Sequence, residues 1–337
     1  MKKPSVSAHR LDAAIEAGLA RFAMLQLGRL VPTPLARART VTAAKVASRF
    51  VEETTPLAER VAAHNPRAIA DFDALVAEAI REARDVSTDG PLALLAALDR
   101  RLYENGDELL DDPAFSMAER VHTLDKLDRF NAHLGSYAKW GALVETLVVS
   151  AEQAGHAPVR VVDLAAGHGG FAIALKQRLG RRIAITATDT ADEYLELGRS
   201  RARASGADIA FAVQDATNLT NFAEGDVDVF LCTQSLHHFP PGMVARLFAE
   251  AARRATTGVS FIDGERGWVP LVTAVLLMTA YGRTWPLIHD TYVSLRRMYT
   301  LEELRLIGAL APAVPDRISI ATGTLRPGFI YLQATIS

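Results

Sequence analysis

The second half of the chain alternates short β-rich runs with helical stretches, and this alternation limits the fold more than any other feature. The β-rich runs span residues 160–164, 183–188, 209–213, 227–232, 259–262, 318–321 and 329–335. Strands that alternate with helices form crossover units, which build a mainly parallel sheet with helices on both faces. Only a short link that contains Gly323 and Gly328 joins the last two runs. The sequence therefore predicts an α/β fold whose last two strands form an antiparallel hairpin.

The first part of the chain is rich in Ala, Leu and Arg and shows helical periodicity. Asn65-Pro66 predicts a helix start, and Pro91 predicts another, because proline is favoured in the first helical turn. We therefore predict an all-helical N-terminal domain over residues 1–115, followed by a second domain over residues 116–337. The helical domain is expected to cover another surface, and the roles of lid, homodimer interface and partner surface all remain open.

The charge balance argues against a dedicated nucleic-acid binder. Lys and Arg number 37 against 39 Asp and Glu, so the net charge is −2, without the basic surplus that phosphate binding requires. The single Cys232 excludes an intrachain disulfide and a multi-cysteine zinc site. The longest apolar run, residues 268–281, is shorter than the roughly 20 residues of a membrane-spanning helix. The N-terminus lacks a secretory apolar core, so we expect a cytoplasmic protein without a membrane span.

A glycine-rich turn follows the first predicted strand and precedes a helix. Glycines in residues 165–170 let the backbone approach a ligand, and the helix N-terminus offers free N–H groups. Asp163 at the strand end would repel a pyrophosphate but favour a cationic ligand. The next two strands end at Asp189, at the right distance to bind a ribose diol, and at Asp215. Acids at three successive strand ends beside such a turn predict a ligand-binding crevice.

Four segments resemble the successive signature segments of the class I S-adenosylmethionine-dependent methyltransferases. These segments are Val161 to Gly170, Thr186 to Thr190, Phe211 to Leu219 and Asp228 to Phe239. The Ser-Leu-His-His-Phe run is similar to the small-molecule branch, which includes quinone-biosynthesis enzymes. The resemblance covers about residues 116–337. It implies a Rossmann-like, seven-stranded, mostly parallel sheet with an antiparallel last strand, S-adenosyl-L-methionine as cofactor and S-adenosyl-L-homocysteine as product.

The resemblance also implies roles for the residues at the strand ends. The methionine part of the cofactor would contact Asp163 and the turn residues Ala165, Gly167 and Gly169. Asp189 would hold the ribose hydroxyls and Asp215 with Ala216 would meet the adenine, while Thr190 and Thr233 complete the predicted cofactor-binding set. No metal is predicted, because the two histidines of the Ser-Leu-His-His-Phe run are adjacent, not at helical ligand spacing, and the nearby acids have cofactor roles.

Methyl transfer from a sulfonium is an in-line displacement, so the protein mainly has to position the acceptor in a dry site. His237 and His238 are the candidate catalytic bases, with a purely structural role as the alternative. Arg296 and Arg297 are interpreted either as a fork for a substrate carboxylate or as solvated side chains. The complete predicted substrate-binding set is Tyr137, Asp263, Arg266, Trp268, His289, Arg296 and Arg297.

The helices before the first strand and the apolar run 268–281 are expected to close the acceptor pocket. Phe130, His133 and Tyr137 fall near one helical face, which predicts a lid. Leu271, Val275 and Met278 would line the pocket from the apolar run, with plain core packing as the alternative.

The sequence leaves four functional hypotheses open. The first is O-methylation of a phenol, hydroxyl or carboxylate on a small organic acceptor. The second is C-methylation of a quinone-like ring, and the third is a non-catalytic S-adenosylmethionine-binding interaction protein. Modification of RNA or protein is a further rival. Base-modifying enzymes typically place Asn or Asp before Pro-Pro and an aromatic residue after the fourth strand, whereas Pro240-Pro241 comes too late here.

Overall fold

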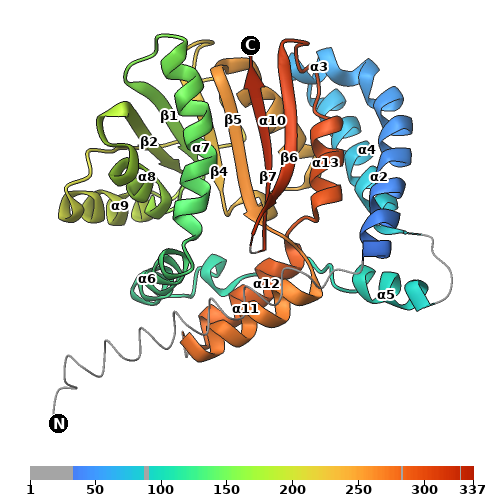
Figure 1. Cartoon of the computed structure of the whole chain (residues 1–337), viewed down its shortest axis with the longest axis horizontal. Helices are drawn as coiled ribbons and strands as arrows, with labels where there is room; N and C mark the ends of the chain where they lie inside the picture. The colour runs from blue at the N-terminus through green and yellow to red at the C-terminus, as the bar shows by residue number, and fades with distance from the viewer. Residues whose placement is uncertain (1–32, 87–90, 282–283, 327) are drawn as a thin grey trace.

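A seven-stranded sheet forms the centre of the protein in the computed structural model, which describes residues 33–86, 91–281, 284–326 and 328–337. The strand order is β3-β2-β1-β4-β5-β7-β6, with β1 to β5 parallel and β7 antiparallel to both β5 and β6 (Figure 1). The predicted α/β fold and its C-terminal hairpin are confirmed. The strands are β1 (Val159–Leu164), β2 (Ile183–Asp189), β3 (Ala210–Val213), β4 (Val227–Thr233), β5 (Ala255–Gly264), β6 (Ile318–Leu325) and β7 (Phe329–Ile336).

Three helices cover one face of the sheet: α7 (Ser136–Gln153), α8 (Gly170–Leu179) and α9 (Asp192–Ser205) (Figure 1). Trp140 and Leu147 of α7 pack in one apolar cluster with strand residues of β1 and β4. Every residue of β4 is buried. A strand that is buried along its whole length is expected where helices cover both faces of a parallel sheet.

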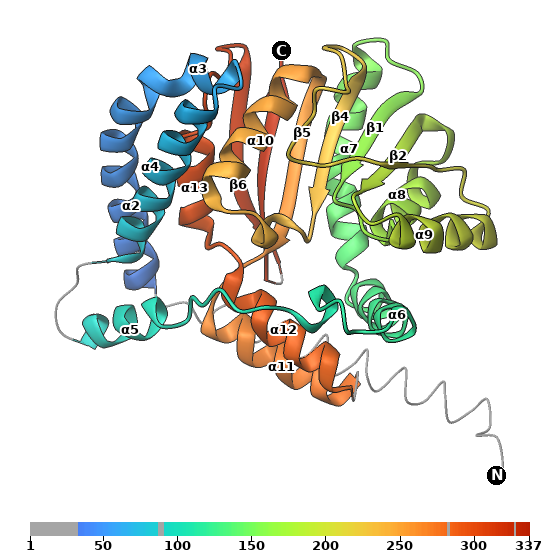
Figure 2. The same ribbon diagram turned by 180° about the vertical axis from the view of Figure 1, so that it is seen from behind.

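The opposite face is covered by α10 (Pro241–Arg254) and α13 (Leu301–Ala309), and α2 (Thr33–Thr54) and α4 (Pro66–Arg84) pack onto these helices (Figure 2). Phe72 of α4 belongs to the same hydrophobic cluster as Phe230 of β4. The predicted boundary at residue 115 therefore does not separate two hydrophobic cores. The reason is that the apolar stripe of α4 completes the core of the α/β layer, so residues 33–84 belong to it.

The predicted helix starts are confirmed by their local hydrogen bonds. The Asn65 side chain accepts from the Ala68 N–H at the start of α4, and α5 (Pro91–Arg100) begins at the predicted proline. Ser116 and Glu119 form a capping box at the start of α6 (Met117–His133). A second capping box, Thr300 with Glu303, starts α13. These caps satisfy N–H groups that have no partner within the helix, which is why short sequence patterns predict them.

A buried ion-pair cluster ties α4 to the α/β layer. The Glu303 carboxylate lies 2.7 Å from Arg84 Nε of α4 and 2.5 Å from Arg266 Nη2, which follows β5. Both Glu303 and Arg266 are almost fully buried. The predicted substrate contact of Arg266 finds no support in the described structure, because its guanidinium is already paired with Glu303 and the Met298 carbonyl.

Several helices gather below the carboxyl ends of the strands. They are α6, α11 (Trp268–Tyr281), α12 (Trp285–Arg297) and α5, together with the short turns η2 (Leu109–Asp111) and η4 (Leu236–His238) (Figures 1 and 2). The remaining short elements are η1 (Thr55–Leu57), α3 (Ala58–Ala62) and η3 (Gly180–Arg182). Among the described helices, none combines the length and the apolar character needed to cross a membrane.

Candidate active site

A cavity of about 1090 Å³ opens at the carboxyl ends of β1, β2 and β4. In the strand order, β1 lies between β2 and β4, and open α/β sheets bind ligands where the strand order reverses. Eight of the predicted site residues line this cavity: Ala165, Gly167, Asp189, Thr190, Thr233, Tyr137, His237 and His238. The predicted crevice is therefore present.

The glycine-rich turn presents bare backbone to the cavity. Ala165, Gly167 and Gly169 all have positive φ angles, of 49°, 56° and 71°. A Cβ at Gly167 would meet open space, whereas a Cβ at Gly169 would lie 2.9 Å from the Phe211 ring. Ala165 is a non-glycine residue in this region, and such strain is typical of functional sites. The turn thus leaves room for a ligand at Gly167, whereas at Gly169 it packs closely against the Phe211 ring.

Asp189 holds the turn in place from the end of β2. Its Oδ2 accepts a hydrogen bond from the Gly167 N–H at 2.8 Å, and its Oδ1 accepts from the Ala191 N–H at 3.0 Å. This carboxylate lines the cavity and lies directly beside the glycine-rich turn. Its position fits the predicted contact with ribose hydroxyls.

Asp163 is a buried carboxyl group with an unused oxygen. The side chain is 1% exposed, and Oδ1 has no hydrogen-bond partner among the described residues. Burial raises the pKa of Asp163 to about 7, and the charge of Asp189 adds to this effect. Asp163 does not itself line the cavity, but an unpartnered carboxyl oxygen at the end of β1 fits the ammonium group of a methionine moiety. The residues at this turn are thus compatible with S-adenosylmethionine.

The two residues predicted to meet the adenine do not line the described cavity. Asp215 Oδ1 accepts hydrogen bonds from the Thr217 N–H and hydroxyl, both at 2.8 Å, so the side chain stabilises its own turn. Ala216 packs in the main hydrophobic cluster. Their predicted role is therefore not supported, because local turn formation and core packing account for both side chains.

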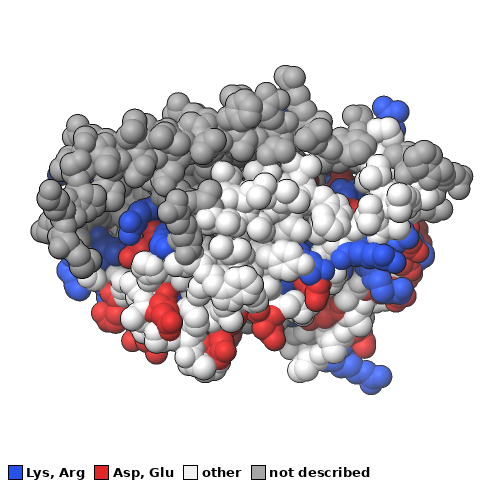
Figure 3. Space-filling model, turned by 90° about the horizontal axis from the view of Figure 1, so that it is seen from below, with Lys and Arg blue, Asp and Glu red and all other residues white. Residues whose placement is uncertain are grey.

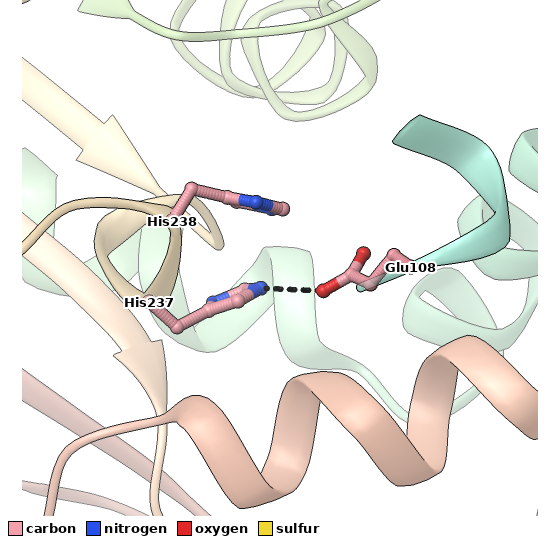
Figure 4. Close-up of side chains that lie close together, drawn as sticks. All are labelled: Glu108, His237 and His238. Carbon is pink, nitrogen blue, oxygen red and sulfur yellow. Dashed lines mark ion pairs between the residues drawn. The ribbon is translucent and has the colours of Figure 1, made fainter. Parts of the chain in front are cut away.

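His237 lies between two carboxylates. Asp263 Oδ2 lies 2.9 Å from His237 Nδ1 and accepts from the His237 backbone N–H at 3.0 Å. On the other side, His237 Nε2 lies 3.6 Å from Glu108 Oε1 (Figure 4). The His238 ring stacks on His237 with 4.4 Å between centroids. Asp263 was predicted to bind substrate, but it lies behind His237 and outside the cavity lining.

The two histidines differ in their electrostatics. Burial by itself lowers the pKa of His237, but the carboxylates of Asp263 and Glu108 raise it to about 10. Burial, together with the charge of the neighbouring His237, lowers the pKa of His238 to about 4. Burial by itself raises the pKa of Glu108, but His237 lowers it to about 2. Both ring nitrogens of His237 face carboxylates, so neither is free to take a proton from the methyl-acceptor molecule. The role of the two histidines as catalytic bases stays a prediction.

Glu108 was not predicted as a site residue. Asp290 of α12 accepts hydrogen bonds from the backbone N–H groups of Leu109 and Leu110, which fixes the η2 turn beside the histidines. The Ser294 hydroxyl donates to Glu108 Oε1 at 2.7 Å, and Arg297 Nη1 lies 3.5 Å from the same oxygen. The predicted substrate residue Arg297 therefore supports Glu108 and does not line the cavity. No local sequence pattern marks Glu108, because helix α12 brings it into place.

Three further predicted substrate residues lie outside the cavity lining. Arg296 pairs with Glu104 and donates to the Leu102 carbonyl at 3.0 Å, so its guanidinium is already used. The His289 ring contacts Asp290 at 2.9 Å. The lower face of the molecule, where α11 and α12 lie in Figure 1, shows an area of uncharged residues (Figure 3). Trp268 is 45% exposed, and other large apolar side chains of α11 and α12 are exposed as well. These side chains are Trp268, Val272, Leu276, Trp285 and Tyr292.

Apolar side chains of α6, α11 and α12 form much of the cavity wall. Phe130 and Tyr137 line it as the lid prediction requires, whereas His133 does not. The Tyr137 hydroxyl donates to Asp128 Oδ1 at 2.5 Å, which joins α7 to α6. Met278 lines the cavity, but Leu271 and Val275 pack in a separate cluster with Leu102. The apolar lining is Leu124, Leu127, Phe130, Leu134, Val269, Pro270, Leu277, Met278, Leu287 and Leu295.

Parts of the chain are similar to known methyltransferases. Residues 161–258 match the family model described as a methyltransferase domain. The structure of the plantazolicin methyltransferase BpumL in complex with SAH superposes with a TM-score of 0.51 and 12% identity, over 78% of this chain and 99% of that chain. Its complex with a pentazolic desmethylPZN analog and SAH gives 0.50 and 12% identity, over 71% and 95%. Residues 161–258 are therefore similar to a methyltransferase domain, and the chain shares the fold of the plantazolicin methyltransferase BpumL.

One curated relative is similar to this chain over a short segment. The demethylmenaquinone methyltransferase of Deinococcus radiodurans is 34% identical to this chain over 90 residues, which are 27% of this chain. The chain matches about a third, 36%, of that relative's length. The likeness therefore covers a minority of both chains.

Proposed function

We propose that the chain transfers the methyl group of S-adenosylmethionine to an oxygen atom of a small organic acceptor. The observation that carries this proposal is the shape of the cavity. One continuous space is lined by the glycine-rich turn with Asp189 and also by apolar side chains of α6, α11 and α12, which form its apolar chamber. A sulfonium bound at the turn would thus face an acceptor held by α6, α11 and α12.

The chain contributes positioning and exclusion of water. Tyr137 and Asp128 hold α6 against α7 over the turn, and Asp128 is also paired with Arg201 of α9 at 2.6 Å. The apolar chamber withholds water from the reacting atoms, which favours displacement at a sulfonium. The polar end of the chamber, with Glu108, His237 and His238, favours an acceptor with an oxygen substituent on a largely apolar skeleton.

Carbon methylation of a quinone-like ring is the second candidate. It is favoured by the likeness to the demethylmenaquinone methyltransferase, whose name specifies such an acceptor. A non-catalytic binding protein is the alternative from another class. Production of S-adenosylhomocysteine with an added acceptor distinguishes an enzyme from a binding protein, and mass analysis of the product locates the methyl group.

We expect Asp189→Ala to weaken S-adenosylhomocysteine binding at least tenfold. The substitution removes the acceptor for ribose hydroxyls and frees the Gly167 N–H that Asp189 now holds. A charge-assisted hydrogen bond contributes about 1.5–3 kcal/mol, which corresponds to that loss or more. Calorimetric titration of both proteins measures it. Asp226→Ala is the matched control, since that carboxylate accepts from the Ala223 N–H at 2.9 Å, lies outside the cavity lining and should leave the affinity within about twofold. Equal affinities for wild type and Asp189→Ala would contradict the assignment.

The acceptor class is tested by supplying S-adenosylmethionine with separate extract fractions. Formation of S-adenosylhomocysteine with the small-molecule fraction alone would support the proposal. Turnover only with the macromolecular fraction would contradict it and favour RNA or protein modification. Binding of the cofactor product without turnover on any fraction would favour the non-catalytic alternative.

We further propose that the N-terminal region serves this site and not a separate partner. Its last segment supplies Glu108 and Asp111 to the cavity wall. The homodimer stays a prediction, and sedimentation of the full chain at micromolar concentration tests it. A monomer at all concentrations would contradict the dimer.

A further inference from the structure

We propose that Glu108, His237 and His238 bind one divalent transition-metal cation on the wall of the cavity. These residues come from two distant parts of the chain, the η2 segment and the η4 turn after β4 (Figure 4). All three line the cavity. The cation site is independent of methyl transfer, but its role toward the acceptor rests on the proposed function.

The spacing of the donor atoms suits a shared cation. One ligand atom from each residue lies within 4.8 Å of the other two. His237 Nε2 and Glu108 Oε1 are 3.6 Å apart, which is longer than a hydrogen bond. Two ligands that each lie about 2.1 Å from one metal at tetrahedral or octahedral angles are about 3.0–3.4 Å apart. Small side-chain movements of Glu108 and His238 would thus bring all three ligand atoms within bonding distance of one ion.

The ligand types are those of a known class of metal site. Two histidines with one carboxylate bind iron(II), zinc and related cations, and they leave coordination positions open. A metal ligand must be a neutral imidazole, so the cation would replace the proton on the His237 Nε2 atom that faces Glu108. Adjacent histidines are unusual as ligands. Here the η4 turn stacks their rings, so both reach the same side of the cavity wall.

The surrounding residues orient the two central ligands as in established metal sites. Asp263 contacts His237 Nδ1, which directs Nε2 toward Glu108, and carboxylate–histidine–metal arrangements use this contact. Ser294 and Arg297 hold Glu108 Oε1 from α12. The other charged group at the cluster is Asp111, whose Oδ2 lies 3.8 Å from His238 Nδ1. His237 and Glu108 are thus fixed before a cation arrives.

The open coordination positions would face the acceptor chamber. A cation there would bind an oxygen of the acceptor and favour its ionised form, because a divalent metal lowers the pKa of a bound hydroxyl. The acceptor class that follows is a small apolar molecule with a phenol, hydroxyl or carboxylate group. Its oxygen would be held by the cation while the methyl group approaches from the glycine-rich turn.

Cobalt(II) titration of the chelator-treated, untagged full chain tests the site. We expect one equivalent to bind with a visible absorption spectrum. Glu108→Gln and His238→Gln are each expected to weaken binding at least tenfold. His156→Gln is the matched control, because His156 Nδ1 also lies near a carboxylate, 3.1 Å from Asp228, but without a second histidine. It should bind cobalt(II) like the wild type.

Thermal unfolding and S-adenosylhomocysteine titration establish that each variant is folded. Absence of saturable cobalt(II) binding, or equal binding by wild type and Glu108→Gln, would overturn the proposal and leave an ion-paired cluster only. Cofactor binding without cobalt(II) binding would overturn the metal site and keep the proposed function. Cobalt(II) binding without cofactor binding would keep the metal site and overturn the proposed function.

Discussion

Glu303→Gln is expected to lower the free energy of unfolding by about 3–5 kcal/mol, the usual cost of removing one partner from a buried ion pair. Glu303 is buried between Arg84 and Arg266, at 2.7 and 2.5 Å. The amide keeps the shape of the side chain but leaves two guanidinium groups without their counter-charge. Because Arg84 belongs to α4, we expect the N-terminal helices to loosen from the α/β layer as well.

Denaturant unfolding of wild type and variant measures this loss. Glu78→Gln is the control, since Glu78 pairs with Arg81 on the surface and should change stability by less than about 1 kcal/mol. Equal losses for the two variants would contradict the prediction.

The pH dependence of stability should also change in Glu303→Gln. Burial by itself raises the pKa of Glu303, but Arg266 and Arg84 lower it to about 2. A carboxyl group with a lowered pKa stabilises the fold above its unfolded pKa of about 4.3, and this contribution is lost as pH falls toward 2. Wild type should therefore lose more stability than Glu303→Gln between about pH 5 and pH 2.

Asp163→Asn is expected to weaken S-adenosylhomocysteine binding by about 10- to 100-fold. The buried Oδ1 has no partner among the described residues, and a charge-assisted contact with an ammonium group contributes about 1.5–3 kcal/mol. The asparagine keeps the size of the side chain and removes its charge. Unchanged affinity, with the fold intact by circular dichroism, would contradict a contact between Asp163 and the cofactor.

The affinity of wild type should also depend on pH. Burial, with the added charge of Asp189, raises the pKa of Asp163 to about 7, while an ammonium ligand requires the ionised form. Binding should therefore release a proton near pH 7. The affinity should reach a plateau at higher pH and fall by up to about tenfold per unit below pH 7. Calorimetry in buffers of different ionisation enthalpy measures the released proton, which Asp163→Asn should not release.

The cofactor half of the site could largely be predicted from the sequence because its parts are local. A parallel strand, a glycine-containing turn and a helix place Asp163, Ala165 and Gly167 together over a few residues. Asp189 follows because neighbouring parallel strands end at the same edge. The capping boxes at Ser116 and Thr300 are local as well, because each joins residues three positions apart. Asp215 shows the limit of this reasoning, since the same residue type can serve its own turn.

The residues around the acceptor part of the cavity could not be predicted from the sequence, because their contacts depend on the tertiary structure. Arg266, Arg296 and Arg297 have the residue type of a substrate clamp, but each found an internal partner that the sequence places far away. Glu108 reached His237 only because Asp290 fixes the η2 turn.

The sequence by itself determined the sheet, the glycine-rich turn and the acids at the strand ends, because short-range backbone hydrogen bonds and hydrophobic periodicity specify them. The tertiary structure alone decided which charges meet. Ion pairs between distant segments depend on how whole helices pack, and no local pattern encodes that packing.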